Sequence, residues 1–269
     1  MSEFFQRILT FVALIILLIS IYFYASNMVL YFIIITISII SLNEWLSLNK
    51  RCSLWALVPF LFILYLMTLL DIRFFIVSLS IIFWIYLFIL LLRFPSTLRK
   101  QIERHHAKYG YLIMIIFTYQ LLYFYPDDNA LNITQSLYEN KRHLFQLILI
   151  ATLIDSYGYI FGKLFGKNKV VVQISPNKTL EGYLGAIIFT LLTLATVAFI
   201  MDITWTFIDT LFLVLLIIFA FLGDLFISFV KRIYNAKDTG NILPGHGGIL
   251  DRIDSYLPIL CIYNYWLLI

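Results

Sequence analysis

Long apolar runs alternate with short polar segments along almost the whole chain. A helix that crosses a bilayer core about 30 Å thick needs about 20 mostly apolar residues. On that basis the pattern predicts about nine transmembrane helices, although the second and the last are short, which leaves one more or one fewer open. The predicted helices cover residues 8–25, 28–42, 54–70, 72–92, 109–125, 144–161, 183–200, 204–229 and 256–269.

The composition supports a membrane environment. Of the 269 residues, 62% are hydrophobic and 13% are charged, whereas an ordinary soluble domain has about 45–50% and about 25%. We therefore expect an all-α, polytopic integral membrane protein that forms one domain over residues 1–269. Its amino-terminal helices would occupy residues 1–143, and residues 144–269 would hold the polar segments described below.

The first apolar run and the two cysteines do not indicate a secreted protein. The run at 8–25 follows Arg7 but is longer than the apolar part of a secretory signal, about 7–15 residues, and a second run follows at once. We interpret it as a retained helix. Cys52 and Cys261 belong to no CxxC motif or Cys/His cluster, so neither a zinc site nor a disulfide framework is indicated.

The basic residues are distributed unevenly between the two sides of the predicted membrane domain. Of the 19 Lys and Arg residues, only Arg73, Lys141 and Arg142 fall in odd-numbered loops. The positive-inside rule then places the amino terminus and the even-numbered loops in the cytoplasm and the carboxyl terminus outside. Some of these cations could instead bind substrate, but the bias remains without the last two basic loops. The net charge of +4 therefore needs no nucleic-acid partner.

Ionisable side chains inside apolar helices are costly and suggest function, and two acidic residues stand out in this respect. Asp155 precedes Gly158, Gly162 and Gly166, whose spacing predicts close packing against another helix. Asp224 lies near the cytoplasmic end of the eighth predicted helix. Ser228, Lys231 and Arg232 follow Asp224 at helical spacing. The two cations alone would fit a basic helix end that reaches toward water, but that reading does not explain Asp224.

The stretch KRIYNAKDTGNILPGHGGILDRIDS, residues 231–255, is too rich in charge and glycine for an ordinary loop. Its glycines flank His246 and would let backbone N–H groups approach an anion closely. Asp251 and Asp254 would share one helical face and could bind a divalent cation. Taken singly, GHGG could be a turn and DRID a helix start. Their occurrence together beside Asp224 favours a phosphate and metal site.

A second polar segment, GKNKVVVQISPNKTLEG at residues 166–182, lies on the same predicted side of the membrane. It supplies Lys167, Lys169, Lys178 and Glu181. For Lys167 and Lys169, a surface loop that follows the positive-inside rule is an equally good explanation.

Both segments resemble one known family. The stretch SFVKRIYNAKDTGNILPGHGGILDRIDS, residues 228–255, resembles the signature of the phosphatidate cytidylyltransferase (CDP-diacylglycerol synthase) family. Residues 155–182 are similar to that family's second polar block, including its terminal S-P-x-K-T-x-E-G. The chain departs from the pattern at Ile227, Gly158, Lys163 and Leu180, where Glu, Ala, Arg and an aromatic residue are common in the family.

The resemblance implies a multi-helix membrane enzyme that transfers a cytidylyl group from CTP to phosphatidic acid. The products would be CDP-diacylglycerol and pyrophosphate. It further implies a homodimer in the lipid bilayer of the inner cell membrane, with Mg2+ at the site and K+ as a candidate second cation.

The resemblance also suggests roles for individual residues. Catalytic roles are expected for Asp224, Lys231, Arg232, Lys237, Asp238, His246, Asp251, Arg252 and Asp254. Among these, the metal ligands would be Asp224, Asp251 and Asp254. Substrate binding is expected of Asp155, Ser175, Lys178, Thr179, Glu181, Ser228, Gly245, Gly247 and Gly248.

Two other functions stay open at this point. A related membrane transferase could use the same metal site on another lipid phosphate or a polyprenol. A transporter would also hold intramembrane acids, but those tend to lie at the midplane between structural repeats. Here the charges cluster near one face and no repeat is evident.

Overall fold

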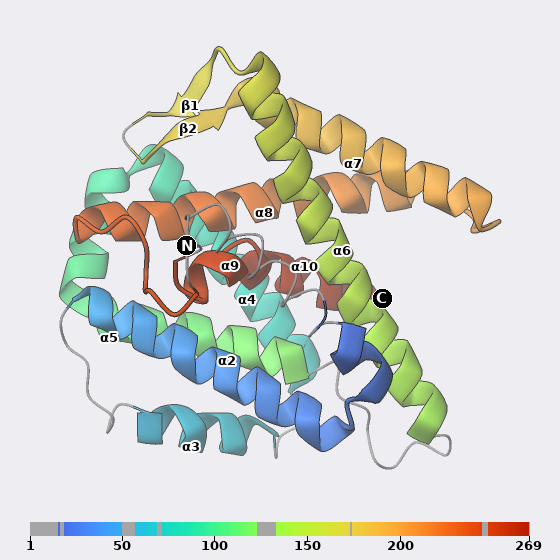
Figure 1. The fold of residues 1–269 in the computed structure, drawn as a ribbon. Coiled ribbons are helices and arrows are strands. Elements are labelled where there is room, and N and C mark those ends of the chain that lie inside the picture. The colour runs from blue at the N-terminus through green and yellow to red at the C-terminus, as the bar shows by residue number, and fades with distance from the viewer. Residues whose placement is uncertain are drawn as a thin grey trace, which may run out of the picture.

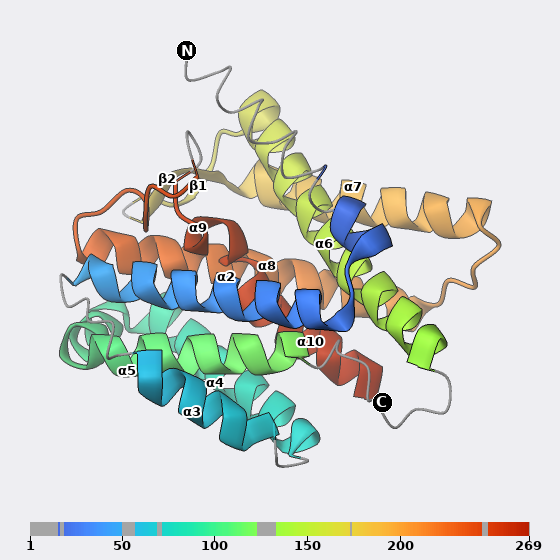
Figure 2. The same cartoon turned by 60° about the horizontal axis from the view of Figure 1, so that its bottom comes forward.

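The fold consists of long helices and one small hairpin (Figures 1 and 2). The computed structural model describes residues 16, 19–49, 57–68, 72–122, 133–172, 174–243 and 247–268. Its helices are α2 (Asn27–Leu48), α3 (Leu57–Thr68), α4 (Arg73–Arg93), α5 (Pro95–Leu122), α6 (Ile133–Phe165), α7 (Leu180–Ile200), α8 (Phe207–Ile233), α9 (Leu250–Ile253) and α10 (Tyr256–Leu268). The strands are β1 (Lys169–Val171) and β2 (Ser175–Thr179).

A helix overlaps every predicted membrane span from the second to the ninth, and most of the first span lies outside the described residues. Within the described part of the chain, five helices are long and apolar enough to cross a bilayer, namely α2, α4, α6, α7 and α8. The apolar helices α3 and α10 are shorter. The chain is thus a helical membrane protein, and the count of nine spans stays a prediction.

Helix α5 begins well before the predicted span at 109–125. It starts with Pro95, which suits the first helical position because the N–H that proline lacks would have no partner there. The backbone leaves helical geometry at His105, with φ −125° and ψ 31°. Leu98 and Ile102, in the polar first half, are fully buried. Burial of these two side chains explains why a segment of low hydropathy folds onto the core.

The two strands form an antiparallel hairpin that the all-α prediction did not include. Lys169 pairs with Thr179, and Val171 pairs with Ser175. Thr179 ends β2 and caps α7, since its hydroxyl accepts a hydrogen bond from the N–H of Gly182 at 3.2 Å. The hairpin therefore delivers the chain directly into the first turn of α7.

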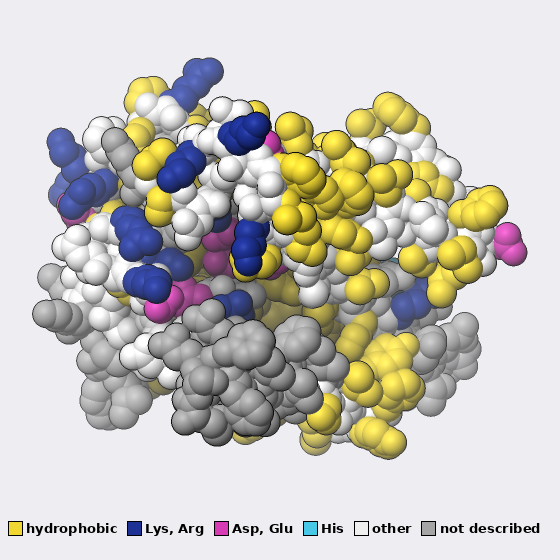
Figure 3. All heavy atoms as spheres, turned by 45° about the horizontal axis from the view of Figure 1, so that its top comes forward, with side chains coloured by type: hydrophobic (Ala, Val, Ile, Leu, Met, Phe, Trp, Pro, Cys, Tyr) yellow, Lys and Arg dark blue, Asp and Glu magenta, His cyan; other side chains and the backbone are white. Residues whose placement is uncertain are grey.

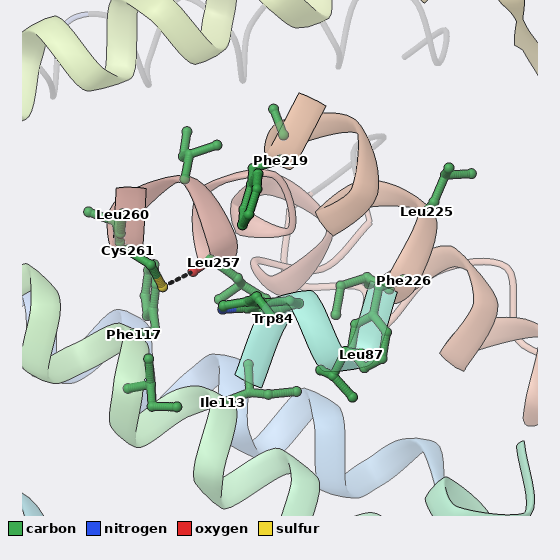
Figure 4. Packing of buried hydrophobic residues seen from close by; sticks show 14 of the residues in the cluster. Trp84, Leu87, Ile113, Phe117, Phe219, Leu225, Phe226, Leu257, Leu260 and Cys261 are labelled. Atoms are coloured by element: carbon green, nitrogen blue, oxygen red, sulfur yellow. Dashed lines mark hydrogen bonds between the residues drawn. The ribbon is translucent and has the colours of Figure 1, made fainter. Parts of the chain in front are cut away.

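The main core lies between α4, α5, α8 and α10 (Figure 4). Trp84 of α4 stands at its centre and meets Phe226 of α8 edge to face, with ring centroids 5.7 Å apart. Polar groups inside the core pair with each other. Gln120 Nε2 donates to Ser80 Oγ at 2.7 Å, and Cys261 Sγ donates to Gln120 Oε1 at 3.2 Å. Such bonds join helices where no water is available.

Helices α6 and α7 pack closely through glycine, as the glycine spacing predicted. A Cβ atom placed on Gly182 of α7 would lie 2.8 Å from the carbonyl oxygen of Gly158 and 3.1 Å from Cα of Gly162. A side chain at position 182 would therefore force the two helices apart.

The expectation that Lys141 lies in an outer loop is wrong for its side chain. Lys141 belongs to α6, is buried, and donates to the carbonyl oxygen of Ala25 at 2.6 Å. Residues 19–24 are helical, so this ammonium group satisfies a carbonyl at the end of a helix, where no intrahelical donor is left.

Candidate active site

The two polar segments found in the sequence meet beside the carboxyl-terminal half of α8. Lys178, on β2, forms an ion pair with Asp224 of α8. Ser228 lies one turn further along α8, and its hydroxyl donates to Asp224 Oδ1 at 3.4 Å. The Lys178 side chain is 17% exposed and that of Asp224 is 34% exposed, so the pair is partly shielded from water. Lys178 and Asp224, which the sequence placed only on the same side of the membrane, are thus in contact in the fold.

Asp251 forms a second, more buried ion pair. Its Oδ1 lies 2.7 Å from Lys231 Nζ. Its Oδ2 accepts from the N–H of Thr239 at 2.8 Å, from the Thr239 hydroxyl at 3.0 Å and from the N–H of Gly248 at 3.0 Å. Burial on its own raises the pKa of Asp251, but the hydrogen bond and charge of Lys231, together with the two backbone N–H groups, outweigh it. The pKa of Asp251 therefore lies below its ordinary value, and the group is an anion that organises the loop.

Asp254 and Asp155 add negative charge to the same region. Asp254 is 8% exposed. Burial, followed by the negative charges of Asp224 and Asp155, raises the pKa of Asp254 above its ordinary value. Asp155 approaches from α6 and interacts electrostatically with Asp224, Lys178 and Arg252. Three carboxylates from three parts of the chain are therefore close enough to repel one another.

The chemistry of these donors suits a hard cation. Mg2+ prefers oxygen ligands and commonly uses one or two carboxylates together with substrate phosphates. The ammonium groups of Lys178 and Lys231 already lie against Asp224 and Asp251, where negative charge attracts a cation. Among the described residues, no three His, Cys, Asp or Glu side chains stand together as a formed metal site. The assignment of metal to Asp224, Asp251 and Asp254 stays a prediction.

Of the glycine-rich turn, the structure describes Gly247 and Gly248. Gly247 has a φ of +86°, a conformation that L side chains rarely adopt. The N–H of Gly248 is occupied by Asp251. Gly245 and His246, for which substrate binding and a catalytic role are expected, lie outside the described residues.

One face of the molecule separates charged from apolar side chains. Figure 3 shows Lys and Arg side chains gathered over one half of this face, around acidic side chains at a hollow. Hydrophobic side chains cover the other half. A polar headgroup and an apolar chain could therefore be held side by side at this boundary.

Comparison with known proteins identifies the family. A model of the Cytidylyltransferase family matches residues 5–269. The chain belongs to this family. The phosphatidate cytidylyltransferase of Staphylococcus haemolyticus is 41% identical over 133 residues, which are 48% of this chain and 50% of that protein. The Staphylococcus saprophyticus protein of the same name is 44% identical over 141 residues, 49% of this chain and 53% of its own length. The chain thus spans about half the length of the curated relatives it matches.

In this chain, several of the predicted site residues make contacts that hold the site together. Glu181 accepts from the backbone N–H groups of Lys167 and Asn168, each at 3.1 Å, and so ties the hairpin to α7. Arg232 donates to the carbonyl oxygens of Ile174 and Ala236 at 3.3 and 3.1 Å. Roles in substrate binding or catalysis for these residues stay predictions.

The remaining predicted residues lie at the edge of the site or on its surface. Ser175 is half-buried on β2, and Thr179 is buried at the start of α7. Lys237, Asp238 and Arg252 are exposed. These three lie on the segment between α8 and α10, where Lys237 and Arg252 could meet a phosphate.

Sequence reasoning missed one acidic residue of this region, Glu44. It lies on α2, is 4% exposed, and accepts from the backbone N–H groups of Ile249 and Leu250 at 3.0 and 2.8 Å. The second span was predicted to end at residue 42, which left Glu44 in a loop. The apolar residues Trp45 and Leu46 directly after it were the signal that the helix continues and that Glu44 is enclosed.

Proposed function

We propose that this protein transfers the cytidylyl group of CTP to phosphatidic acid, giving CDP-diacylglycerol and pyrophosphate. The ion pair between Lys178 and Asp224 carries the proposal, because it ties one of the two segments that resemble the family to α8, one turn before the other segment begins at Ser228. The printed names of the relatives, phosphatidate cytidylyltransferase, support the choice of both substrates.

In the proposed reaction, a phosphate oxygen of phosphatidic acid attacks the α-phosphorus of CTP. A new P–O bond forms there, and the bond from the α-phosphorus to the oxygen that bridges to the β-phosphate breaks. Pyrophosphate leaves with that bond's electron pair. Since the attacking oxygen is already anionic near neutral pH, no strong general base is needed. The protein must position two polyanions and offset their repulsion.

The cations of the site would carry out this task. Lys178 and Lys231 are half-buried, where a charge acts more strongly than in water, and each already holds a carboxylate. Lys237 and Arg252 are exposed and would contact the phosphates of incoming substrate. Arg232, Asp238 and His246 would support them.

We further propose Mg2+ as the cofactor, with K+ as a candidate second cation. Asp224, Asp251 and Asp254 would hold the metal, and Asp155 lies close enough to contribute. When bound, Mg2+ would offset the charge that develops on the phosphate oxygens. Asp224 and Asp251 would then exchange lysine partners for the metal, which would free two ammonium groups for the phosphates.

We also propose a homodimer in the inner cell membrane, with the amino terminus and the site segments in the cytoplasm and the carboxyl terminus outside. The family resemblance supports the dimer and the membrane. The distribution of Lys and Arg supports the orientation.

A labelling experiment tests the reaction. Purified full-length protein is incubated with CTP labelled at the α-phosphate, phosphatidic acid and Mg2+. We expect label in the lipid phase and pyrophosphate release in equal amount, both dependent on phosphatidic acid. Label that enters lipid only when a polyprenol or another lipid phosphate replaces phosphatidic acid would identify a related transferase. CTP that crosses vesicles unchanged would identify a transporter, and either result would refute the proposal.

A further inference from the structure

The loop between α8 and α9 is held from a distant part of the chain by Glu44. Glu44 Oε1 accepts from the N–H of Ile249 at 3.0 Å, and Oε2 accepts from the N–H of Leu250 at 2.8 Å. The Thr239 hydroxyl lies 3.2 Å from Oε2. One buried carboxylate therefore contacts Thr239 and accepts hydrogen bonds from Ile249 and Leu250.

These bonds satisfy backbone groups that the loop leaves unpaired by itself. The first N–H groups of a helix have no partner within the helix. Ile249 occupies the N-cap position of α9 and has no polar side chain to offer. Glu44 supplies the missing acceptor from α2 instead.

The carboxylate of Glu44 also requires glycine at two positions of the loop. A Cβ atom placed on Gly240 would lie 2.5 Å from Glu44 Oε1, and one on Gly248 would lie 2.5 Å from Oε2. A side chain at either position would therefore displace the Glu44 carboxylate from its place. The lack of side chains at Gly240 and Gly248 therefore leaves room for the Glu44 carboxylate, in addition to permitting a turn.

Thr239 connects Glu44 to the ion pair of the site. Its hydroxyl lies 3.0 Å from Asp251 Oδ2 and 3.2 Å from Glu44 Oε2. A hydroxyl has a single hydrogen to donate, so Thr239 can donate to only one of the two carboxylates at a time. Its oxygen lies between them. Asp251 in turn receives Lys231 at 2.7 Å. The chain of contacts runs from α2 to the end of α8.

Helix α2 is itself anchored next to Glu44. Trp45 Nε1 donates to the carbonyl oxygen of His106 at 2.9 Å, and His106 Nε2 donates to the carbonyl oxygen of Trp45 at 2.7 Å. The two rings stack with centroids 5.3 Å apart. Trp45 also packs against Phe226 of α8. Glu44 is therefore presented by a segment fixed to α5 and α8.

We infer that Glu44 is a positioning residue of the active site, which sets the conformation of residues 239–243 and 247–250 and so fixes Asp251 and its partner Lys231 where the metal and the nucleotide phosphates would bind. The effect of Glu44 on the kinetics rests on the proposed function. Its effect on the conformation of the loop does not, since the bonds from Glu44 to the loop are independent of the reaction.

Glu44→Gln is the informative variant because it keeps the volume of the side chain. In the amide, an NH2 group replaces one of the two carboxylate oxygens. This group cannot accept a hydrogen bond from the loop N–H that it faces, so one set of loop contacts is lost. We expect kcat/KM for CTP to fall about 10- to 100-fold, the usual range for outer contacts that orient a site, with a clear rise in KM. Loss of folded protein alone would lower the apparent kcat at unchanged KM.

Hydrogen exchange provides a readout without substrates. In Glu44→Gln, exchange of the amides in residues 247–253 should rise, while the helices α4 and α10 keep wild-type exchange. Glu103→Gln is the matched control, since it removes the same charge from an exposed residue that pairs with Arg99 at 2.9 Å. It should leave both measurements unchanged.

The outcomes separate the two proposals. Unchanged exchange in residues 247–253, or an unchanged KM for CTP in an active enzyme, overturns the role of Glu44. A wild-type protein that forms no cytidine lipid refutes the proposed function, while the exchange experiment still decides on Glu44. Where Glu44→Gln does not insert, Thr239→Val removes the shared hydroxyl at constant shape. It must then raise the KM for CTP, and wild-type kinetics in that variant also overturn the inference.

Discussion

At the scale of single residues, the surroundings decide what each carboxylate does. Asp209 lies in a capping box at the start of α8, where Thr206 and Asp209 satisfy each other's backbone N–H groups. Asp224 faces one lysine and a serine hydroxyl, which leaves acceptor capacity for a metal or a donor from substrate. Asp251 accepts from Lys231, Thr239 and Gly248 at once. The same side chain therefore caps a helix, binds a cation or organises a loop.

We predict that Asp251→Asn and Asp254→Asn nearly abolish turnover at limiting Mg2+. Asn keeps the shape and one acceptor oxygen but removes the charge, so charge neutralisation in the transition state should weaken by several kcal/mol, about 100-fold or more in rate. Turnover per mole of inserted protein is the measurement.

Asp209→Asn is the control for these two variants. It changes the same group in the capping box at the opposite end of α8, where loss of a cap costs about 0.5–2 kcal/mol of stability. Turnover of the folded enzyme should not change. Near-normal turnover in both Asp251→Asn and Asp254→Asn would remove them from the metal site.

We predict that Lys178→Ala lowers turnover about 100-fold, the effect of losing one well-placed electrostatic donor. The substitution leaves Asp224 without its ion pair and removes a cation from the proposed phosphate site. Lys108→Ala is the control, because Lys108 is exposed on α5. Lys141 would not serve as a control, since it is buried and supports a helix end. Rates are compared at equal amounts of inserted protein. Equal rates for the two variants would show that Lys178 only follows the positive-inside rule and does not take part in turnover.

Sequence reasoning found the charged residues of the site but not what holds them. Asp155 and Asp224 stood out because an apolar environment does not explain a charge, and Lys178 stood out through the family resemblance. Thr239 gave no such signal, and the apolar residues after Glu44 indicate only that it is enclosed, since its partners lie about 200 positions away. Contacts of this kind depend on the tertiary fold, and hydropathy alone does not encode them.

At the scale of elements, the apolar runs predicted the helices well because lipid and core burial both require continuous apolar surface. Helix α8 was expected at 204–229 and covers Phe207–Ile233. The ends were less predictable. Helix α5 starts at Pro95 because Leu98 and Ile102 are buried, and the hairpin of β1 and β2 forms in a segment where charges concealed its Val-rich strand. In both cases a few local contacts outweighed the average hydropathy.

The packing of α6 on α7 leads to a prediction about two glycines. Gly182→Ala should destabilise the protein by about 1–3 kcal/mol, the usual cost of overpacking, because its Cβ would meet backbone atoms of Gly158 and Gly162. Gly158→Ala should be nearly neutral, since the nearest atom to its Cβ would be Ala186 Cβ at 3.9 Å. Thermal unfolding of both variants in detergent provides the measurement. Equal melting temperatures would show that α6 and α7 separate without cost.

At the scale of the whole molecule, several helix ends that are far apart in sequence lie together at one end of the fold. The carboxyl-terminal end of α8, that of α2 and the amino-terminal end of α5 lie at the same end of the molecule in both ribbon views, while the carboxyl terminus of the chain lies at the other (Figures 1 and 2). Lys50 and Arg51 follow α2, Arg99, Lys100 and Arg104 lie in the first part of α5, and Lys231, Arg232 and Lys237 lie at or just after the end of α8. Sequence and fold thus agree on which helix ends lie on the same side of the membrane domain. The distribution of Lys and Arg is what predicts that this side faces the cytoplasm.

We therefore predict that a cysteine at Lys100 is modified only from the cytoplasmic side and a cysteine appended after Ile269 only from outside. Lys100 is exposed on α5, so a single cysteine suits this position, whereas a protein reporter inserted there would interrupt the helix. Cys52 is first changed to Ser, and Cys261 stays because it is fully buried. A membrane-impermeant thiol reagent is applied to intact cells and to inverted vesicles. Each Lys or Arg favours the cytoplasmic side, and Arg93, Arg99, Lys100, Arg104 and Lys108 cluster within one segment. Modification of both cysteines from the same side would require an even number of spans between the amino-terminal half and the carboxyl terminus, and the nine-span topology would then be wrong.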